Sequence, residues 1–319
     1  MIRWQVVLLG ILWGGLMVSA AQGQTLVNQS GKNWGVSVGT YFVYDDNVIN
    51  QPSQASARPA GLPTNPDDTA FAWDGRAYYK HSFNNKFHLR ASYDIDMTVY
   101  GELNQYDLTS QMFGLSPTYK ITPTMNIMLD YNYIYNIVDG DNFSGINYVG
   151  PSFNHMHEKF GLTRLYYTYK DTDNWQNDLR DNRHHTLGFA HYFFFSNYTR
   201  RIGIDYQYST ENTDGSAFDR DNHRIKIKGK TPLVWGWEGD IDISYTFRQY
   251  DTRLGSAGTL RDDTLQRYQF GLTRVLLKNW QCLQDLTLIL KYRRLENNTN
   301  LLTRDFASNR ADIGFQARF

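Results

Sequence analysis

The chain has 319 residues, and its 32 Lys and Arg balance 32 Asp and Glu, so that the formal net charge is zero. This balance argues against nucleic-acid binding, which usually needs a surplus of basic residues, and the single cysteine, Cys282, excludes an internal disulfide. The mean hydropathy of −0.55 is typical of a soluble protein, yet 15 % of the residues are aromatic.

The first residues have the pattern of an export signal. Arg3 precedes the apolar run VVLLGILWGGLMV, and the small residues of SAAQGQ follow it. A membrane anchor helix is the alternative, but the run is shorter than the roughly 18–20 apolar residues that cross a bilayer. We therefore predict a signal peptide over 1–24, which is cleaved on export, and a mature domain over 25–319.

From residue 34 onward, apolar and polar side chains alternate with a period of two. In residues 87–99, for example, the odd positions are apolar and the even positions are polar. Such alternation is typical of strands with one apolar and one polar face. About fourteen strands are predicted, with starts near residues 34, 69, 86, 108, 124, 147, 160, 184, 200, 222, 238, 265, 283 and 308.

The connections between these strands alternate in kind. Short turns are expected at 84–85, 122–124, 157–159, 196–198, 234–237 and 278–280, and long polar loops at 45–68, 138–146, 171–183, 210–221, 251–263 and 296–306. This alternation is the plan of an outer-membrane barrel, in which the sheet must close because lipid offers no partner to a free backbone amide. The sequence thus predicts an all-β, transmembrane, up-and-down antiparallel barrel of about 14 strands. A β-sandwich or a propeller is the soluble alternative.

Aromatic residues occur where such a barrel would meet the membrane surfaces. Trp34, Trp235, Trp237 and Trp280 fall at strand starts or short turns, as expected for a girdle on the periplasmic side. The last strand ends in ADIGFQARF, with Phe315 and Phe319 on its apolar face. We expect these two residues to form the signal for the barrel-assembly machinery, and the last strand to pair with the first, WGVSVGTYF, so that no free edge remains.

The tyrosine-rich strands, YDDN at 44–47, RDD at 261–263 and the terminal Phe319 resemble Gram-negative outer-membrane barrels. More narrowly, they resemble the fourteen-stranded barrel of the surface lipoprotein assembly modifier family, and related barrels occur in exopolysaccharide export. In that family a periplasmic helical-repeat domain usually precedes the barrel, whereas about ten residues separate the predicted signal from the first strand here. The resemblance implies export of a protein substrate with a separate periplasmic partner.

Many charged residues occupy the polar face of the predicted strands. The lumen-lining candidates are Arg90, Asp94, Asp96, Asp130, Arg201, Asp205, Arg224, Lys226, Lys228, Lys230, Asp240, Asp242, Arg248, Lys291 and Arg293. In one interpretation, the basic ladder from Arg224 to Lys230 favours anions or polar solutes in a water-filled lumen. In the other, these charges pair across strands, at about 0.2–1 kcal/mol each, without any selectivity. The loop at 45–68 either folds in as a constriction or lies outside.

The chain offers no clear catalytic or metal site. His191 and Ser196 lie five residues apart on one strand, about 16 Å at roughly 3.3 Å per residue, so they cannot form a hydrolase pair. The adjacent His184 and His185 point to opposite faces, and a metal site from that pair is not expected. The segments 139–142 and 219–222 are rich in Asp and Asn, which suits either turns or weak calcium binding. We predict no enzyme activity and no cofactor.

The sequence therefore predicts a porin-like channel or export pore for a polar solute or chain, in the outer membrane of a Gram-negative bacterium. The alternatives are a barrel that exports a surface lipoprotein with a periplasmic partner, and a structural or adhesive barrel that presents its loops. The expected partners are outer-membrane lipid and lipopolysaccharide, the barrel-assembly machinery and a possible periplasmic export partner, but no nucleic acid.

Overall fold

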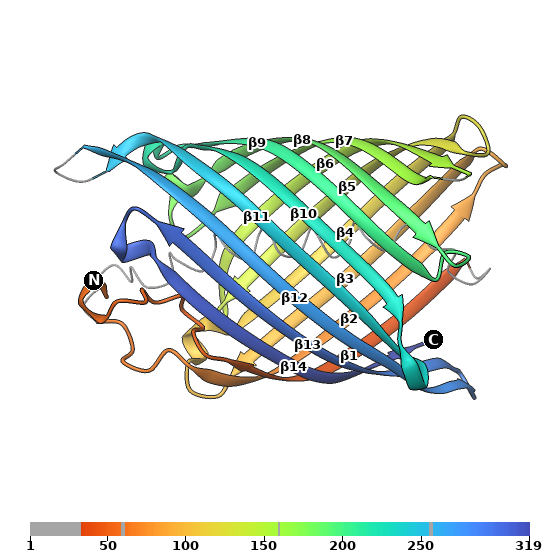
Figure 1. Cartoon of the computed structure of the whole chain (residues 1–319), viewed down its shortest axis with the longest axis horizontal. Helices are drawn as coiled ribbons and strands as arrows, with labels where there is room; N and C mark the ends of the chain where they lie inside the picture. The colour runs from red at the N-terminus through yellow and green to blue at the C-terminus, as the bar shows by residue number, and fades with distance from the viewer. Residues whose placement is uncertain (1–32, 59–60, 159, 255–257) are drawn as a thin grey trace.

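A computed structural model describes residues 33–58, 61–158, 160–254 and 258–319. Fourteen antiparallel strands follow one another around a closed barrel, and β14 pairs with β1 (Figure 1). The strands are β1 (Trp34–Asp45), β2 (Asp68–Ser82), β3 (Phe87–Tyr100), β4 (Leu108–Lys120), β5 (Met125–Val138), β6 (Asp141–His157), β7 (Gly161–Asn174), β8 (Asn182–Phe195), β9 (Arg200–Thr213), β10 (Arg220–Pro232), β11 (Trp237–Leu254), β12 (Thr259–Trp280), β13 (Leu283–Thr299) and β14 (Phe306–Arg318). The predicted up-and-down barrel is confirmed. The predicted signal peptide, 1–24, lies outside the described residues.

The two ends of the barrel differ in their connections. At one end, on the right of Figure 1, at most four residues separate consecutive strands, and the C-terminus lies there too. We call this the short-turn end. At the opposite loop end, the longest connection is 46–67, which we call the first loop. Short 3₁₀ turns occur in several loop-end connections, at Asn104–Tyr106, Asp178–Arg180, Ser216–Phe218 and Leu302–Arg304. In the described ranges, no helix is both long enough and apolar enough to cross a membrane.

The strands extend further at the loop end than the alternation predicted. β6 begins at Asp141 rather than near 147, and β12 begins at Thr259 rather than near 265. The predicted loop at 138–146 is therefore wrong. A two-residue turn, Asp139–Gly140, with φ angles of 54° and 77°, joins β5 to β6 instead, as expected for a tight hairpin. Most of the predicted loop at 251–263 is likewise paired strand, and the predicted turn at 278–280 lies within β12.

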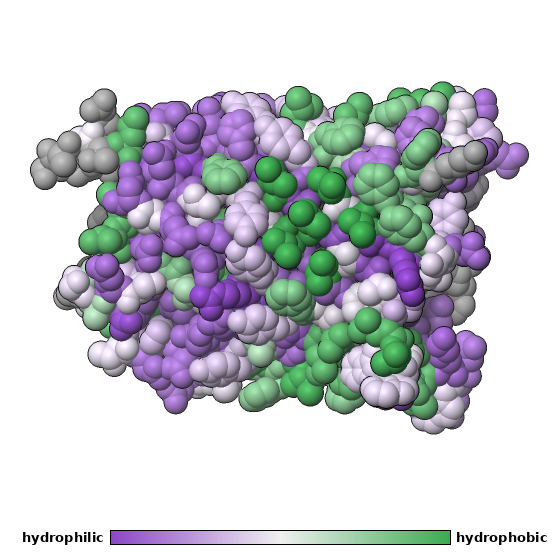
Figure 2. Space-filling view, viewed as in Figure 1, coloured by the Kyte–Doolittle hydropathy of each residue, from purple (hydrophilic) through white to green (hydrophobic). Residues whose placement is uncertain are grey.

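The outer face of the barrel is apolar across its middle. Ile227 of β10 lies between Ile204 of β9 and Ile243 of β11 in the strand register, and its side chain is 42 % exposed. Figure 2 shows hydrophobic residues gathered over the centre and the short-turn half of this view, with hydrophilic residues over the loop half. Exposed apolar side chains over a closed sheet are the surface that lipid requires. Trp34, Trp235 and Trp280 are exposed at the short-turn end.

A ring of outward-facing tyrosines marks the limit of the apolar band on the side of the loop end. One tyrosine from each odd-numbered strand between β3 and β13 bonds through its hydroxyl group to a polar side chain of the neighbouring strand. These pairs are Tyr93–Gln111, Tyr131–Asn147, Tyr167–His185, Tyr206–His223, Tyr245–Tyr268 and Tyr292–Asn309. Tyrosine suits a membrane interface because its ring is apolar and its hydroxyl group needs a polar partner. We call this ring the tyrosine girdle.

The first loop folds into the barrel rather than away from it. Val48 and Ile49 are buried in a cluster with Ala70 and Tyr100, two residues of the inner face of β2 and β3. Gln51 is buried as well, and its backbone N–H donates to the Asn47 side chain at 2.7 Å. Of the two alternatives that the sequence left open for this loop, the structure thus has the inward-folded one, which packs part of the interior at the loop end.

Candidate functional site

A cavity of about 190 Å³ lies inside the barrel toward the loop end, and its lining residue Tyr106 belongs to the same buried cluster as Val48 and Ile49 of the first loop. We call it the loop-end cavity. Side chains from nine consecutive strands, β4 to β12, reach it, together with Tyr106 and Arg180 from two loops. The strand residues that line it are Leu108, Asn136, Val138, Phe143, Ser144, Ile146, Lys170, Thr172, Asn174, Asn182, His184, Gln207, Ser209, Glu211, Arg220, Asn222, Arg224, Ser244, Thr246, Arg248, Leu265 and Arg267.

One wall of the loop-end cavity is strongly basic. Arg220 and Arg224 of β10, Arg248 of β11 and Arg267 of β12 lie on it, and Lys170 and Arg180 add two further cations. Among the residues that line the cavity, Glu211 is the only carboxylate. Because guanidinium groups stay protonated in proteins, this wall carries a fixed surplus of positive charge.

Several of these cations have unused hydrogen-bonding capacity. The Nε atoms of Arg180, Arg224 and Arg267 are buried and have no hydrogen-bond acceptor within the described part of the chain. Arg180 and Arg267 are each only 8 % exposed. A buried donor without an acceptor costs about 1–3 kcal/mol, and more when it is charged. These three guanidinium groups therefore have donors left for a further acceptor.

The opposite wall of the loop-end cavity is apolar. Leu108, Val138 and Ile146 come from the inner faces of β4, β5 and β6. The register between β5 and β6 shifts after Asn136, so that Phe143 is an extra residue in β6 and its buried side chain joins this wall. Such bulges re-aim a side chain without breaking the sheet. The cavity thus has one basic and one apolar side.

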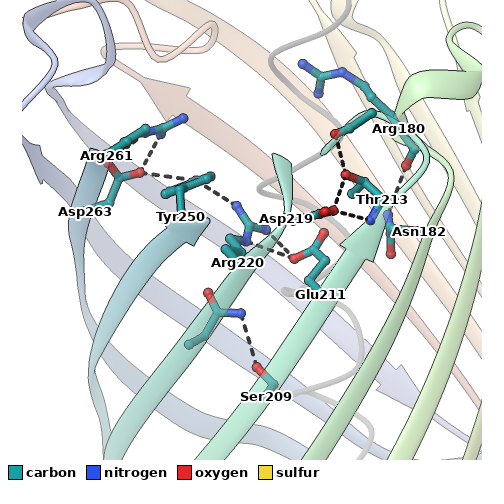
Figure 3. Close-up of polar contacts among 12 residues, drawn as sticks. Arg180, Asn182, Ser209, Glu211, Thr213, Asp219, Arg220, Tyr250, Arg261 and Asp263 are labelled. Carbon is teal, nitrogen blue, oxygen red and sulfur yellow. Dashed lines mark hydrogen bonds and ion pairs between the residues drawn. The ribbon is translucent and has the colours of Figure 1, made fainter. Parts of the chain in front are cut away.

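A hydrogen-bonded network across four strands forms the rim of the cavity (Figure 3). The Nη2 and Nε atoms of Arg220 donate to one oxygen of Glu211 at 2.6 and 2.9 Å. Arg220 Nη1 also donates to the Tyr250 hydroxyl oxygen at 2.9 Å, and Tyr250 in turn contacts Asp263, which accepts from Arg261 Nε at 2.8 Å. The network ties β9, β10, β11 and β12 together at their loop ends.

Arg180 reaches the cavity from a loop rather than from a strand. Its guanidinium carbon lies 4.8 Å from the centre of the Phe218 ring, which belongs to the next loop at this end. Burial, with the neighbouring cations Arg304 and Arg220, lowers the pKa of Arg180 to about 10. Its backbone is held because Asp181 accepts the N–H of Asn174 at 2.7 Å. Burial also raises the pKa of Asp181.

The predicted lumen-lining residues all lie at positions that the strand register assigns to the inner face. Contacts between non-adjacent strands identify that face: Tyr166 of β7 donates to Asp205 of β9 at 2.8 Å. Of the fifteen residues, the structure brings Arg224 and Arg248 together in the loop-end cavity, and the other thirteen are distributed along the rest of the interior: Arg90, Asp94, Asp96, Asp130, Arg201, Asp205, Lys226, Lys228, Lys230, Asp240, Asp242, Lys291 and Arg293.

Ion pairs link several of these predicted residues. Lys226 Nζ lies 2.8 Å from Asp242 Oδ2, and Lys230 Nζ lies 2.6 Å from Glu238 Oε1. Arg224 and Lys228, in the same ladder, have no ion pair within the described residues. The basic ladder is therefore partly neutralised, and the two interpretations made from the sequence each describe a part of it.

Sequence reasoning missed four cavity cations: Lys170, Arg180, Arg220 and Arg267. Arg220 lies in a stretch that was predicted as a loop, and Arg180 has no strand periodicity to place it. Arg267 and Lys170 lie opposite Ser244 and His184 in the strand register, and counting in twos along β12 and β7 could have placed them on the inner face.

The histidine and Asp/Asn motifs have structural roles. His184 lines the cavity, whereas His185 bonds to the Tyr167 hydroxyl group on the outer face at 2.6 Å, so the predicted opposite orientation is confirmed. Asp219, in one of the two segments considered for calcium, accepts the backbone N–H of Thr213 at 2.6 Å. In the described residues, no group of three or more His, Cys, Asp or Glu side chains is placed to hold a metal ion.

Comparison with solved structures shows a similar fold in an outer-membrane channel. The outer membrane channel DcaP of Acinetobacter baumannii matches with a TM-score of 0.52 and 11 % identity, over 90 % of this chain and 96 % of that one. An anion-selective porin from Comamonas acidovorans matches with a TM-score of 0.45 and 10 % identity, over 90 % and 98 % of the two chains. Likeness at this level of identity concerns the fold alone. No curated protein sequence matches the chain.

The family comparison covers the whole barrel. The model of the surface lipoprotein assembly modifier family matches residues 34–319, which begin with β1 and end with the chain. Together with the closed fourteen-stranded wall and its apolar outer face, this match places the protein in the outer membrane of a Gram-negative bacterium. The chain belongs to the surface lipoprotein assembly modifier family.

Proposed function

We propose that this protein is an outer-membrane passage for polar, mainly anionic solutes. The observation that carries the proposal is the surplus of interior cations without carboxylate partners. Arg224, Lys228, Arg248 and Arg267 face the interior, and none has an ion pair within the described part of the chain. A part of a passage that carries a surplus of one sign of charge raises the local concentration of ions of the opposite sign.

Ion pairs lower the net charge of one part of the interior wall and so weaken the preference for anions there. Lys226 with Asp242, and Lys230 with Glu238, leave little net charge on their part of the wall. Selectivity should therefore depend mainly on Arg224, Arg248 and Arg267, which lie closer to the loop end. The first loop, packed against β2 and β3, narrows the same part of the interior, so that a solute must pass close to the basic wall.

Planar-bilayer recordings test this proposal. In a KCl gradient, the reconstituted barrel should give a reversal potential of the sign expected for chloride preference. The triple substitution Arg224→Gln, Arg248→Gln and Arg267→Gln should move it toward zero. Arg294→Gln is the matched control, since Arg294 pairs with Glu296 on the outer face. A folded barrel that gives no conductance, or an unchanged reversal potential in the triple variant, would contradict the proposal.

A second candidate function is favoured by the family match. We propose as the alternative that the barrel assists the surface assembly of a lipoprotein, together with a separate periplasmic partner. The supporting observation is that the family model matches all fourteen strands rather than a part of the barrel. In this case the short-turn end would meet the periplasmic partner, because this end carries the chain terminus and the short turns.

This alternative is tested in cells. The barrel is co-expressed with a candidate surface lipoprotein, and the exposed lipoprotein is measured by protease treatment of whole cells. Exposure that depends on the barrel, and that is lost when the turn at 233–236 is replaced by a Gly-Ser turn, would support the export role. Equal exposure with and without the barrel, for the lipoproteins of the source organism, would reject it.

A further inference from the structure

We infer that the loop-end cavity is a binding site for a small organic acid that combines an apolar body, such as one ring or a short acyl chain, with an anionic group. That this acid is the transported cargo rests on the proposed function. Its binding to the cavity is measured without transport. It follows from the two-sided lining of the cavity, its size and the unused donors in its basic wall.

The anionic group of the ligand is specified by the basic wall. Arg224 and Arg267 are contributed by β10 and β12 to this one cavity, and each has a buried Nε atom without an acceptor within the described residues. A guanidinium group presents donors in a planar fork that matches a carboxylate or a phosphate. Burial of such a group is costly unless an anion or water meets it. An anion bound between these side chains removes that cost.

The apolar body of the ligand is specified by the opposite wall. Val138, Phe143 and Ile146 are each buried and line the cavity, although they belong to an interior that is polar at most other positions. Water makes few hydrogen bonds at such a wall, whereas an apolar group that covers it is stabilised because apolar surface is removed from water. An inorganic anion would satisfy the arginines and leave this wall wet. A ligand with both parts satisfies both walls.

The size of the cavity limits the ligand. Its volume of about 190 Å³ exceeds the roughly 150 Å³ of an engineered apolar cavity that holds one benzene molecule. One ring with a carboxylate fits this space, whereas a polymer chain does not. The cavity is also within reach of the exterior, because the residues of its rim, Glu211 and Arg220, lie near the loop ends of β9 and β10.

Binding is tested on the full-length barrel in an uncharged detergent by isothermal titration with three probes: benzoate, benzyl alcohol and inorganic phosphate. Benzoate should bind at least tenfold more tightly than either of the others, since benzyl alcohol lacks the charge and phosphate lacks the ring. Arg267→Gln should weaken benzoate binding at least tenfold. Phe143→Ser should weaken benzoate binding and leave phosphate binding unchanged. Arg201→Gln, which removes an inward-facing arginine at the short-turn end, should change neither.

Folding is checked by the shift in gel mobility on heating, and only folded variants are compared. If Arg267→Gln does not fold, Arg248→Gln takes its place. The inference is overturned if benzoate binds no more tightly than phosphate, or if Arg201→Gln weakens binding as much as the cavity variant does. Bilayer recordings test the proposed passage separately from the binding site. Tight benzoate binding without conductance keeps the site and rejects the passage, whereas anion-selective conductance without benzoate binding keeps the passage and rejects the site.

Discussion

Arg220 directs two of its guanidinium nitrogens to a single carboxylate oxygen of Glu211, at 2.6 and 2.9 Å, across the pair of strands β9 and β10. The two residues are direct partners in the strand register, and both side chains are largely buried. Glu211 is also the only carboxylate among the residues that line the loop-end cavity. One residue therefore affects both the stability of the rim and the charge of the cavity.

Glu211→Gln should change these two properties in opposite directions. Loss of the charge-assisted bonds should lower the free energy of unfolding by about 1.5–3 kcal/mol, as measured by urea unfolding in detergent micelles. The cavity, without its acid, should show a stronger preference for anions in bilayer recordings. The double variant Glu211→Gln with Arg220→Met should recover part of the stability, because it also removes the unpaired buried charge. A stable single variant with unchanged selectivity would contradict this account.

The inward fold of the first loop predicts a change in conductance. Ile49→Asp places a charge in the apolar cluster around Val48 and Tyr100. The loop should then leave the interior, so that single-channel conductance rises and proteinase K, which has little sequence preference, cleaves the loop faster. Ser56→Asp is the control, since Ser56 is already exposed. Equal conductance in the two variants would show that the loop does not narrow the passage.

The tyrosine girdle predicts where the lipid-facing part of the outer surface ends. Ile227→Arg puts a charge on the outer face within the apolar band, between Ile204 and Ile243, and should destabilise the folded barrel by about 2–4 kcal/mol in lipid vesicles. Asn298→Arg puts the same charge on the outer face of β13, beyond Tyr292 of the girdle, and should cost only about 0–1 kcal/mol. Equal costs at the two positions would show that the girdle is not the boundary.

The closing strand predicts a defect in assembly. The backbone N–H of Phe319 donates to the Val36 carbonyl oxygen at 2.9 Å, and Phe315 is exposed on the outer face. Deletion of Phe319 should block insertion into the outer membrane while secretion across the inner membrane continues, as measured by cell fractionation. Ala317→Ser, in the same strand, serves as the control. Normal outer-membrane levels of the deletion would reject a role for Phe319 as an assembly signal.

The hydrogen bond from the backbone of Asn174 to Asp181 predicts a local effect on binding. Asp181→Ala removes the acceptor of the Asn174 N–H and should cost about 0.5–1.5 kcal/mol, with faster hydrogen exchange at Asn174. Since this loop positions Arg180 over Phe218, benzoate binding should weaken as well. Asp139→Ala, in the hairpin turn between β5 and β6, should leave binding unchanged.

The alternation of side chains was a reliable guide where one face of a strand meets lipid. β1, β9 and β13, which begin at the short-turn end, begin at the predicted residues, because lipid on one side forces an apolar residue at every second position. The prediction was wrong at β6 and β12, whose first residues lie at the loop end. Where both faces of a strand meet water, no periodicity is required. The dipeptide Asp139–Gly140 was nevertheless a hairpin signal in the sequence.

The candidate site was harder to predict than the fold. Period-two counting put Arg224 and Arg248 on the polar face, but it could not show that β4 to β12 leave a cavity between them. The apolar wall depends on Phe143, an extra residue at a bulge, and bulges interrupt the alternation from which faces are predicted. Arg180 is positioned by a loop in which Asp181 accepts the backbone N–H of Asn174. In the sequence, Asp181 stands among polar residues as in any ordinary turn, so this role could not be predicted.

The strands continue past the tyrosine girdle, so that one part of each strand must face lipid and the other part need not. Beyond the girdle, outward residues such as Asp171 of β7 and Asn212 of β9 are polar, while inward residues of the same strands, Lys170 and Glu211, line the cavity. Substitutions there need not preserve a lipid-facing surface. On the function proposed above, a change of solute therefore requires changes only in inward side chains beyond the girdle, while the part that inserts and closes stays the same.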